Sequence, residues 1–525
     1  MAHCTDLREH SRRDFLRQLG LLGAGTLVLG QSHVHALVAA PALSDAPTDR
    51  VLVLLRLKGG NDGLNTILPL HDYATYRAAR PEVHLKETEG TKLGRDLVVH
   101  PQMARLRGLW EEGAMRIVRG VGYPEQNLSH FRSADIWATT SEADVVVSSG
   151  VLGRYLEGVY PAFLSAPPAT PPAIQIGGVG NLLFNNSDNF NYAVSTRDPA
   201  QLYEVAKTGR LYGLDALPDG TYGDQLGYLR AVANTTFRYA AVLAEAYRAG
   251  SNAAEYRDDT LGEQLSLVAR LLRGGLGTKL FVVELDGFDT HAKQLEEHAY
   301  LLRSVSENVA AFYADLGTAG QGERVLTMTF SEFGRRVAQN ASLGTDHGAA
   351  APLLLFGPAL EGSGTVGAPP DLQDLDPTGN LKYDTDFRSV YATVLEQWLC
   401  IEAAAVDELL GSSPVRLGNL GFTCGDTTVA TERPADPAAT IGLSAYLSGD
   451  AVTVEYSLAG PAEVRLHFYN VGGQRLSTPF RGVQQAGPQQ HRFGLIAANL
   501  SAGIYLVSVE TGGRVYTRRI ALFRP

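Results

Sequence analysis

The sequence predicts an α/β fold with a mostly parallel central sheet, followed by a small all-β sandwich at the C-terminal end. Short apolar runs are typical of buried parallel strands, and they occur at 51–57, 279–285 and 324–330. Amphipathic segments alternate with these strands and are expected to be helices covering the sheet, at 225–249, 260–273 and 292–316. After Cys424 the apolar period becomes two, which indicates antiparallel strands.

Further segments complete the large domain, which we expect to span residues 44–424. Strands and helices are predicted, in chain order, at 114–121 (strand), 130–139 (helix), 352–356 (strand) and 386–399 (helix). Asp386 suits the N-cap of the last helix, and the Pro/Ala-rich segment 165–173 predicts a loop. A stretch rich in Thr, Asp, Ala and Pro, residues 425–440, predicts a linker to the tail at 441–525.

The composition is that of a globular protein, with 525 residues, 45% hydrophobic content and a net charge of −11. This negative charge speaks against a nonspecific nucleic-acid partner. Beyond the N-terminal segment, no stretch approaches 18 uncharged apolar residues, so no internal membrane span is predicted. Cys400 and Cys424 are compatible with one disulfide in an oxidising compartment or with two unpaired thiols, and their spacing does not decide between these.

The N-terminus has the three parts of an export signal, predicted over residues 1–43. Arg12 and Arg13 precede Phe15 and Leu16, an apolar run follows, and small residues come after it. Paired arginines at this distance from Phe-Leu are the twin-arginine pattern, so the twin-arginine translocase is an expected partner. The alternative is an amphipathic helix with a chance arginine pair.

Polar side chains follow several predicted strands, where sites form in open α/β sheets. These residues are Asp62, Asp286, Asp289, His291 and Glu332. Asp346 and His347 lie in a Gly-flanked loop just before the strand at 352–356. Carboxylates with imidazoles suit a divalent metal ion such as Zn, Mn, Fe, Ca or Mg, and the sequence leaves its identity open.

Each candidate also has a structural interpretation. Asp62 is able to hold a turn through its own backbone, and the segment from Asp289 to His291 suits the start of a helix. The dipeptide at 346–347 suits a plain loop, and Glu332 has Arg335 as a possible ion-pair partner. Ser129, at a predicted helix start, is either an N-cap or a nucleophile favoured by the positive helix end.

These motifs together resemble a family of unknown function called DUF1501, over about residues 10–422. The motifs are Gly59–Asn65, Tyr76 with Arg80-Pro81, Ser129–Phe131, Asp289–His291, Ser331–Arg335 and Gly344–Gly348. The family looks like a branch of the alkaline phosphatase/sulfatase superfamily, which implies a large α/β sandwich with a metal site at the strand ends. The resemblance implies metal-binding roles for Asp62, Asp289, His291 and His347, and the nucleophile position for Ser129.

The chain departs from the superfamily pattern at one place. Glu332-Phe333 stands where an Asp-His pair is usual, and Asp346-His347 occupies the place of the late histidine. The Asp289/His291 spacing is also shorter than usual. A full two-metal site, a one-metal site and a degenerate site without catalysis therefore stay open.

The tail resembles the type A C-terminal sorting domain of type IX secretion. The residues that carry this resemblance are Ala502–Leu506, the paired-glycine turns and Arg518–Leu522. It implies the type IX secretion machinery as a partner, a Gram-negative host of the Bacteroidetes kind, and passage from the periplasm to the cell surface or the medium.

Two functions follow as hypotheses. The first is an exported metal-dependent hydrolase of phosphate or sulfate esters, in which Ser129 attacks the ester centre. Its metal ligands would come from Asp62, Asp289, His291, Glu332, Asp346 and His347, and Arg132 or Arg335 would hold the small anionic substrate. The second is a non-catalytic exported surface protein that retains an alkaline-phosphatase-like fold. The two differ in whether the expected metal ligands converge.

Overall fold

The structure is a computed structural model, and the residues it describes fall in several ranges. These are 48–177, 182–188, 190–196, 211–213, 217, 221–360, 362–418, 420–424, 443–448, 451–458, 460–470, 475–494, 503–511 and 514–522. The predicted export signal at 1–43 and the predicted linker at 425–440 lie outside the described residues.

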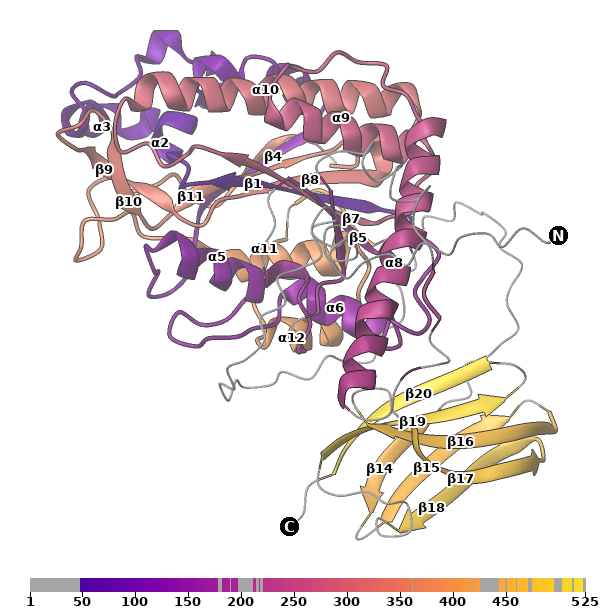
Figure 1. Cartoon of the computed structure of the whole chain (residues 1–525). Coiled ribbons are helices and arrows are strands. Elements are labelled where there is room, and N and C mark those ends of the chain that lie inside the picture. The colour runs from indigo at the N-terminus through magenta and orange to yellow at the C-terminus, as the bar shows by residue number, and fades with distance from the viewer. Residues whose placement is uncertain are drawn as a thin grey trace. The chain divides into compact units, whose positions relative to one another are not determined.

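The large unit is built on a nine-stranded sheet, shown edge-on in Figure 1. Its order is β12 (Gly364–Val366), β4 (Met115–Gly122), β11 (Ala351–Phe356), β8 (Val325–Phe330), β1 (Val51–Lys58), β7 (Leu280–Asp286), β5 (Ala173–Ile176) and β6 (Ala193–Thr196), with β13 (Thr385–Asp386) beside β4. β11 runs antiparallel to both of its neighbours, whereas the other pairs are parallel. The predicted α/β fold with a mostly parallel sheet is confirmed.

The central strand β1 shows why these sequences form strands. Its residues Val51–Leu55 are at most 3% exposed, because β7 and β8 flank it and helices cover both faces. A strand buried on both faces requires a continuous apolar run, which was the signal in the sequence.

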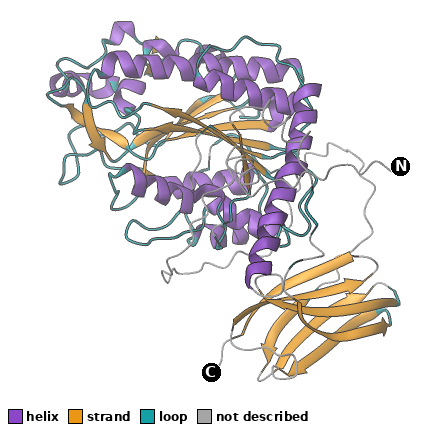
Figure 2. Ribbon diagram, viewed as in Figure 1, coloured by secondary structure: helices purple, strands orange, loops and turns teal. Residues whose placement is uncertain are grey.

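Helices lie on both faces of this sheet (Figures 1 and 2). One face carries α9 (Thr260–Arg273) and α10 (Gln294–Thr318), and the other carries α5 (His130–Thr139), α6 (Val151–Val159), α11 (Phe387–Thr393) and α12 (Ala403–Leu410). A further helix, α8, spans Thr221–Ala249. Asp386 caps α11 as predicted, by accepting from the Arg388 amide at 2.8 Å. The predicted helix at 386–399 continues beyond α11 as a π-helical turn, Val394–Trp398.

The C-terminal strands form two antiparallel sheets, which confirms the predicted small all-β sandwich. One sheet contains β14 (Ser444–Ser448), β15 (Ala451–Leu458) and β18 (Gly487–Gly494). The other contains β17 (Arg475–Gln484), β16 (Ala462–Asn470), β19 (Gly503–Thr511) and β20 (Arg514–Leu522). Alternate apolar residues of both sheets share one core, including Val452, Val454, Val464, Leu466 and Val507.

Cys400 and Cys424, whose pairing the sequence left open, form a disulfide with a Cα–Cα distance of 5.5 Å. Within the described ranges, none of the helices combines the length and the apolar character that crossing a bilayer requires.

Candidate metal centre

Four loops meet at one edge of the central sheet. The strands β1, β4, β7 and β8 run in the same direction, so the segments that follow them gather at their shared carboxyl end. Gly59, at φ +122°, allows its backbone to approach that of Asp289 closely, because a Cβ there would lie 2.3 Å from the Asp289 amide nitrogen. This approach brings the loop after β1 against the loop after β7.

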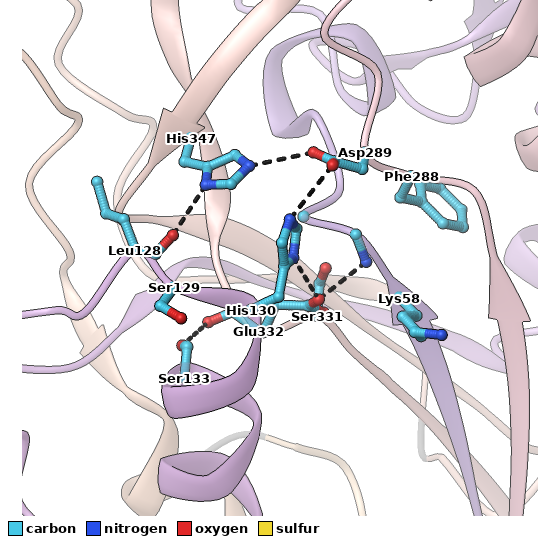
Figure 3. Close-up of polar contacts among 12 residues, drawn as sticks. Lys58, Leu128, Ser129, His130, Ser133, Phe288, Asp289, Ser331, Glu332 and His347 are labelled. Carbon is cyan, nitrogen blue, oxygen red and sulfur yellow. Dashed lines mark hydrogen bonds and ion pairs between the residues drawn. The ribbon is translucent and has the colours of Figure 1, made fainter. Parts of the chain in front are cut away.

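Three imidazoles converge on the carboxylate of Asp289. The Nε2 atoms of His291 and His347 each lie 3.1 Å from Asp289 Oδ1 and 2.9 Å from one another. His130 Nε2 lies 3.3 Å from the other oxygen, Oδ2 (Figure 3). Ligand atoms of His130, Asp289 and His347 all fall within 4.8 Å of one another, close enough to share one ion.

Each of these imidazoles is anchored through its other ring nitrogen. His130 Nδ1 lies 3.0 Å from Glu332 Oε1, and His291 Nδ1 lies 3.3 Å from Asp346 Oδ1. His347 Nδ1 lies 2.8 Å from the carbonyl oxygen of Leu128. Histidines that bind metals characteristically donate their second N–H to a carboxylate or a carbonyl in this way.

The anchor of His347 decides where its proton lies. A carbonyl oxygen only accepts, so Nδ1 of His347 carries the hydrogen and the Nε2 of the neutral ring presents a lone pair. Burial lowers the pKa of His347, which favours this neutral ring. Its lone pair therefore faces the carboxylate oxygen of Asp289 at 3.1 Å. Two acceptors at this distance repel unless a cation or a proton lies between them.

Asp289 is ionised because of its neighbours. Partial burial on its own would raise the pKa of this carboxyl, but the Arg335 guanidinium, which donates to it, and the charge of the neighbouring His130 lower the pKa to about 2. The Arg335 guanidinium donates to Oδ1 at 2.7 Å. The carboxylate is thus charged at neutral pH and its orientation is fixed.

A hairpin of β9 (Gly334–Gln339) and β10 (Thr345–Gly348) carries His347 into the centre. The predicted Gly-flanked loop at 344–348 is therefore largely a strand. A Cβ on Gly344 would lie 2.2 Å from the His291 backbone, so the glycine lets the hairpin pack onto the loop after β7. Asn340 Nδ2 donates to the carbonyl of His291 at 2.9 Å and to Asp346 Oδ1 at 3.1 Å. These bonds set the spacing between His291 and His347.

Phe333 follows Glu332, at the place where the resemblance stated above leads us to expect a histidine. Its ring packs against the rings of His130 and His347, with centroid distances of 4.8 and 4.4 Å. It supplies no ligand atom, and it helps to hold two imidazoles in position.

The two arginines that were predicted to hold an anionic substrate are engaged elsewhere. The buried guanidinium of Arg335 donates to carbonyls of four residues, Gly59, Gly60, Phe288 and Thr345, besides Asp289. Arg132 donates to the carbonyls of Glu142, Ala143 and Val145. Arg335 is therefore a structural partner of Asp289 and not of Glu332, and Arg132 holds a loop.

Asp62 does not join the three imidazoles. Its buried carboxylate pairs with Arg80 at 2.6 Å, accepts from Gln294 and caps the short helix α2 (Gly63–Thr66) through the Leu64 amide. Burial alone would raise the pKa of Asp62, but Arg80 outweighs this and the pKa lies below its usual range. These contacts are those of the turn-holding role, which the sequence offered as the alternative to a metal ligand.

Three further predicted residues lie beside the centre. Ser129 is exposed at the N-cap position of α5, and its hydroxyl makes no capping bond. Ser129 therefore occupies the N-cap position of α5, but its side chain does not cap the helix. Glu332 is buried behind His130, and Asp346 lies behind His291, so neither carboxylate joins the imidazoles at Asp289.

His130 is a candidate ligand to which the sequence analysis assigned no role, although it lies in the quoted motif Ser129–Phe131. It opens α5 directly after Ser129, and the signal was present as a histidine at a predicted helix start following the loop after β4. The anchor of His347 could not be found from the sequence, because Leu128 makes this contact through its backbone carbonyl, which every residue type has.

Comparisons with known proteins give a family match in part of the chain. The model of a family described as "Protein of unknown function (DUF1501)" matches residues 231–410, which confirms that part of the expected resemblance. The matched segment contains Asp289, His291, Glu332, Arg335 and His347, whereas Asp62 and His130 precede it. A search of curated proteins finds no match.

Several solved structures match the chain weakly. A protein in the alkaline phosphatase superfamily from Vibrio parahaemolyticus is 9% identical, with a TM-score of 0.30, covering 98% of this chain and 92% of its own. The phosphonate monoester hydrolase SpPMH from Silicibacter pomeroyi is 9% identical, with a TM-score of 0.30 and coverages of 90% and 89%. The PsFucS1 sulfatase from Pseudoalteromonas sp. is 11% identical, with a TM-score of 0.32 and coverages of 86% and 85%. At such scores these likenesses carry no argument about activity.

Proposed function

We propose that the protein is a hydrolase of phosphate or sulfate esters that depends on a divalent metal ion held by His130, Asp289, His291 and His347. The observation that carries the proposal is the convergence of three Nε2 atoms on one carboxylate, each ring being anchored through Nδ1.

The donor set fits a metal ion in distance and in chemistry. Ligand atoms around a tetrahedral ion at about 2.0–2.1 Å lie about 3.3 Å from one another. The separations of 2.9–3.3 Å between Asp289 and each imidazole, and between His291 and His347, are close to this value, and the ligand atoms of His130 and His347 lie within 4.8 Å of one another. Three imidazoles and one carboxylate favour Zn, Mn or Fe over Ca and Mg, which prefer oxygen ligands.

A metal bound here would supply Lewis-acid polarisation of an ester oxygen. Ser129 is the candidate nucleophile, because its exposed hydroxyl makes no cap and precedes His130 in the chain. The positive end of the ten-residue helix α5 would favour the anionic group of the substrate.

One observation favours the second candidate function, a non-catalytic surface protein. Both arginines expected to bind the substrate anion donate instead to backbone carbonyls. Anion recognition would then depend on the metal and the start of α5. Asp62, one of the expected ligands whose convergence separates the two functions, pairs with Arg80 instead, which also favours this alternative.

Metal analysis of the purified full-length protein, with a panel of phosphate and sulfate esters, tests the proposal. We expect the purified protein to contain metal or to take it up when it is added. His291→Ala and His347→Ala should bind the metal at least about tenfold more weakly, because each variant loses a ligand. The matched control His71→Ala, an exposed histidine bonded to the Pro370 carbonyl, should bind like wild type. Ser129→Ala should keep the metal and lose turnover.

The outcomes separate the two functions. Protein that takes up no metal under supplementation would overturn the metal centre. A metal-loaded protein without turnover on any ester of the panel would favour the non-catalytic function.

We further propose that the protein is exported by the twin-arginine translocase and carried outward by the type IX secretion machinery. Arg12-Arg13, the C-terminal sandwich and the Cys400–Cys424 disulfide support this, because disulfides persist in oxidising compartments. Replacing both arginines by lysine should retain the chain in the cytoplasm, and deleting 441–525 should retain it in the periplasm. Fractionation that shows both variants distributed like wild type would contradict this route.

A further inference from the structure

The carboxylate of Glu332 lies behind His130, at the opposite side of the ring from Asp289 (Figure 3). Glu332 is 1% exposed, and its Oε1 accepts from His130 Nδ1 and from the Gly59 amide, both at 3.0 Å. Its Oε2 is buried and has no hydrogen-bond partner among the described residues. A buried carboxylate with one unsatisfied oxygen costs free energy, so packing alone does not account for a glutamate here.

The neighbouring cation does not account for it either. Arg56 Nη2 lies 3.8 Å from Glu332 Oε1, whereas Arg56 Nη1 lies 3.2 Å from Glu284 Oε2. Glu284 is thus the closer partner of Arg56. The imidazole of His130, at 3.0 Å, is nearer to Glu332 than the guanidinium is.

The backbone of the same residue fixes the helix that carries His130. The Glu332 carbonyl accepts from the Ser133 hydroxyl and from Trp137 Nε1, and both donors belong to α5. Glu332 therefore holds the first turns of α5 through its main chain and the His130 ring through its side chain. The two contacts together set both the place and the rotation of this imidazole.

We propose that Glu332 is a positioning residue of the metal centre, which keeps the Nδ1 hydrogen of His130 directed to its own carboxylate and Nε2 directed to the ion. The inference rests on the proposed function, because it presupposes a metal at His130. It replaces the sequence-based expectation that Glu332 is itself a ligand. A carboxylate behind a ligating imidazole fixes its orientation and raises its basicity.

Co²⁺ titration of the full chain, followed by visible absorption, tests this role. We expect Glu332→Ala to bind Co²⁺ roughly 10–100-fold more weakly, the loss seen for such outer partners, with a changed absorption band because the ring is no longer oriented. Glu332→Gln keeps the size and one acceptor oxygen, so it should recover part of the affinity. Glu284→Ala removes the other carboxylate at Arg56 and should leave both affinity and spectrum unchanged.

A double-variant cycle separates positioning from a general loss of structure. In a His130→Ala background, Glu332→Gln should cause no further loss of Co²⁺ affinity, because its effect passes through the imidazole. Wild-type affinity and spectrum in both Glu332 variants would overturn the positioning role while leaving the metal centre in place. Wild-type protein that binds no Co²⁺ would overturn the metal centre itself, and the positioning role with it.

Discussion

Replacing Arg335 by methionine is expected to lower the free energy of unfolding by about 3–5 kcal/mol, because it leaves several buried carbonyl oxygens without their donor at roughly 1–3 kcal/mol each. The guanidinium is 1% exposed and donates to four loop carbonyls and to Asp289 Oδ1. Methionine fills much of the volume but leaves these acceptors buried without donors. Urea unfolding of the metal-free protein measures the change without a contribution from bound ion.

Two companion variants show which property of Arg335 matters. Arg335→Lys keeps the charge near Asp289 but has no planar fork to reach several carbonyls, so we expect it to recover only part of the loss. Arg95→Met, at an exposed arginine, should change stability by no more than about 0.5 kcal/mol. A methionine variant as stable as wild type would show that the loop edge does not depend on the guanidinium.

The sheet was predictable because its strands are apolar on both faces. β1, β7 and β8 were expected within one residue of their observed bounds. The antiparallel direction of β11 was not, because an apolar run carries no information about direction. The four-residue strands β5 and β6 are too short to show a period.

Residues of the candidate site were most readily predictable where a residue type that binds metals directly follows a predicted strand. Asp289 and His291 satisfy both conditions, whereas His347 was singled out in a Gly-flanked loop before a strand; the structure brings the three together. Arg335 shows why the rest was not predictable. Its donors are satisfied by backbone oxygens of loops distant in the chain, and residue type does not reveal where those oxygens lie.

Asp62 presents the same difficulty in sharper form. Its place after the first strand and its residue type fit a ligand and a helix cap equally well. What decides is Arg80, 18 residues later, whose side chain reaches the carboxylate at 2.6 Å. Arg80 thus supplies the positive charge that a metal ion would otherwise supply to this buried carboxylate.

Arg80→Met is therefore expected to destabilise the fold by about 3–5 kcal/mol, because it leaves the Asp62 carboxylate buried without its counter-charge. Arg80 also donates to Asn65 Oδ1 and to the carbonyls of Arg336 and Val337. Arg77→Met, at an exposed arginine of helix α3 (Tyr73–Ala79), which Arg80 follows as its C-cap residue, is the matched control and should unfold like wild type. Denaturant unfolding at neutral pH measures both.

The pH dependence tests the cause. The folded-state pKa of Asp62 lies below its usual range, so the pair contributes stability above the unfolded pKa of about 3.9 and loses it as the pH falls further. In Arg80→Met, burial without the counter-charge should raise the pKa of Asp62. The difference in free energy of unfolding between this variant and wild type should therefore shrink toward acid pH. Asp62→Asn in the Arg80→Met background should recover part of the lost stability at neutral pH.

Because Asp62 lies outside the imidazole cluster, the Asp62→Asn variant should also keep its metal. Loss of metal in a folded Asp62→Asn variant would restore Asp62 as a ligand.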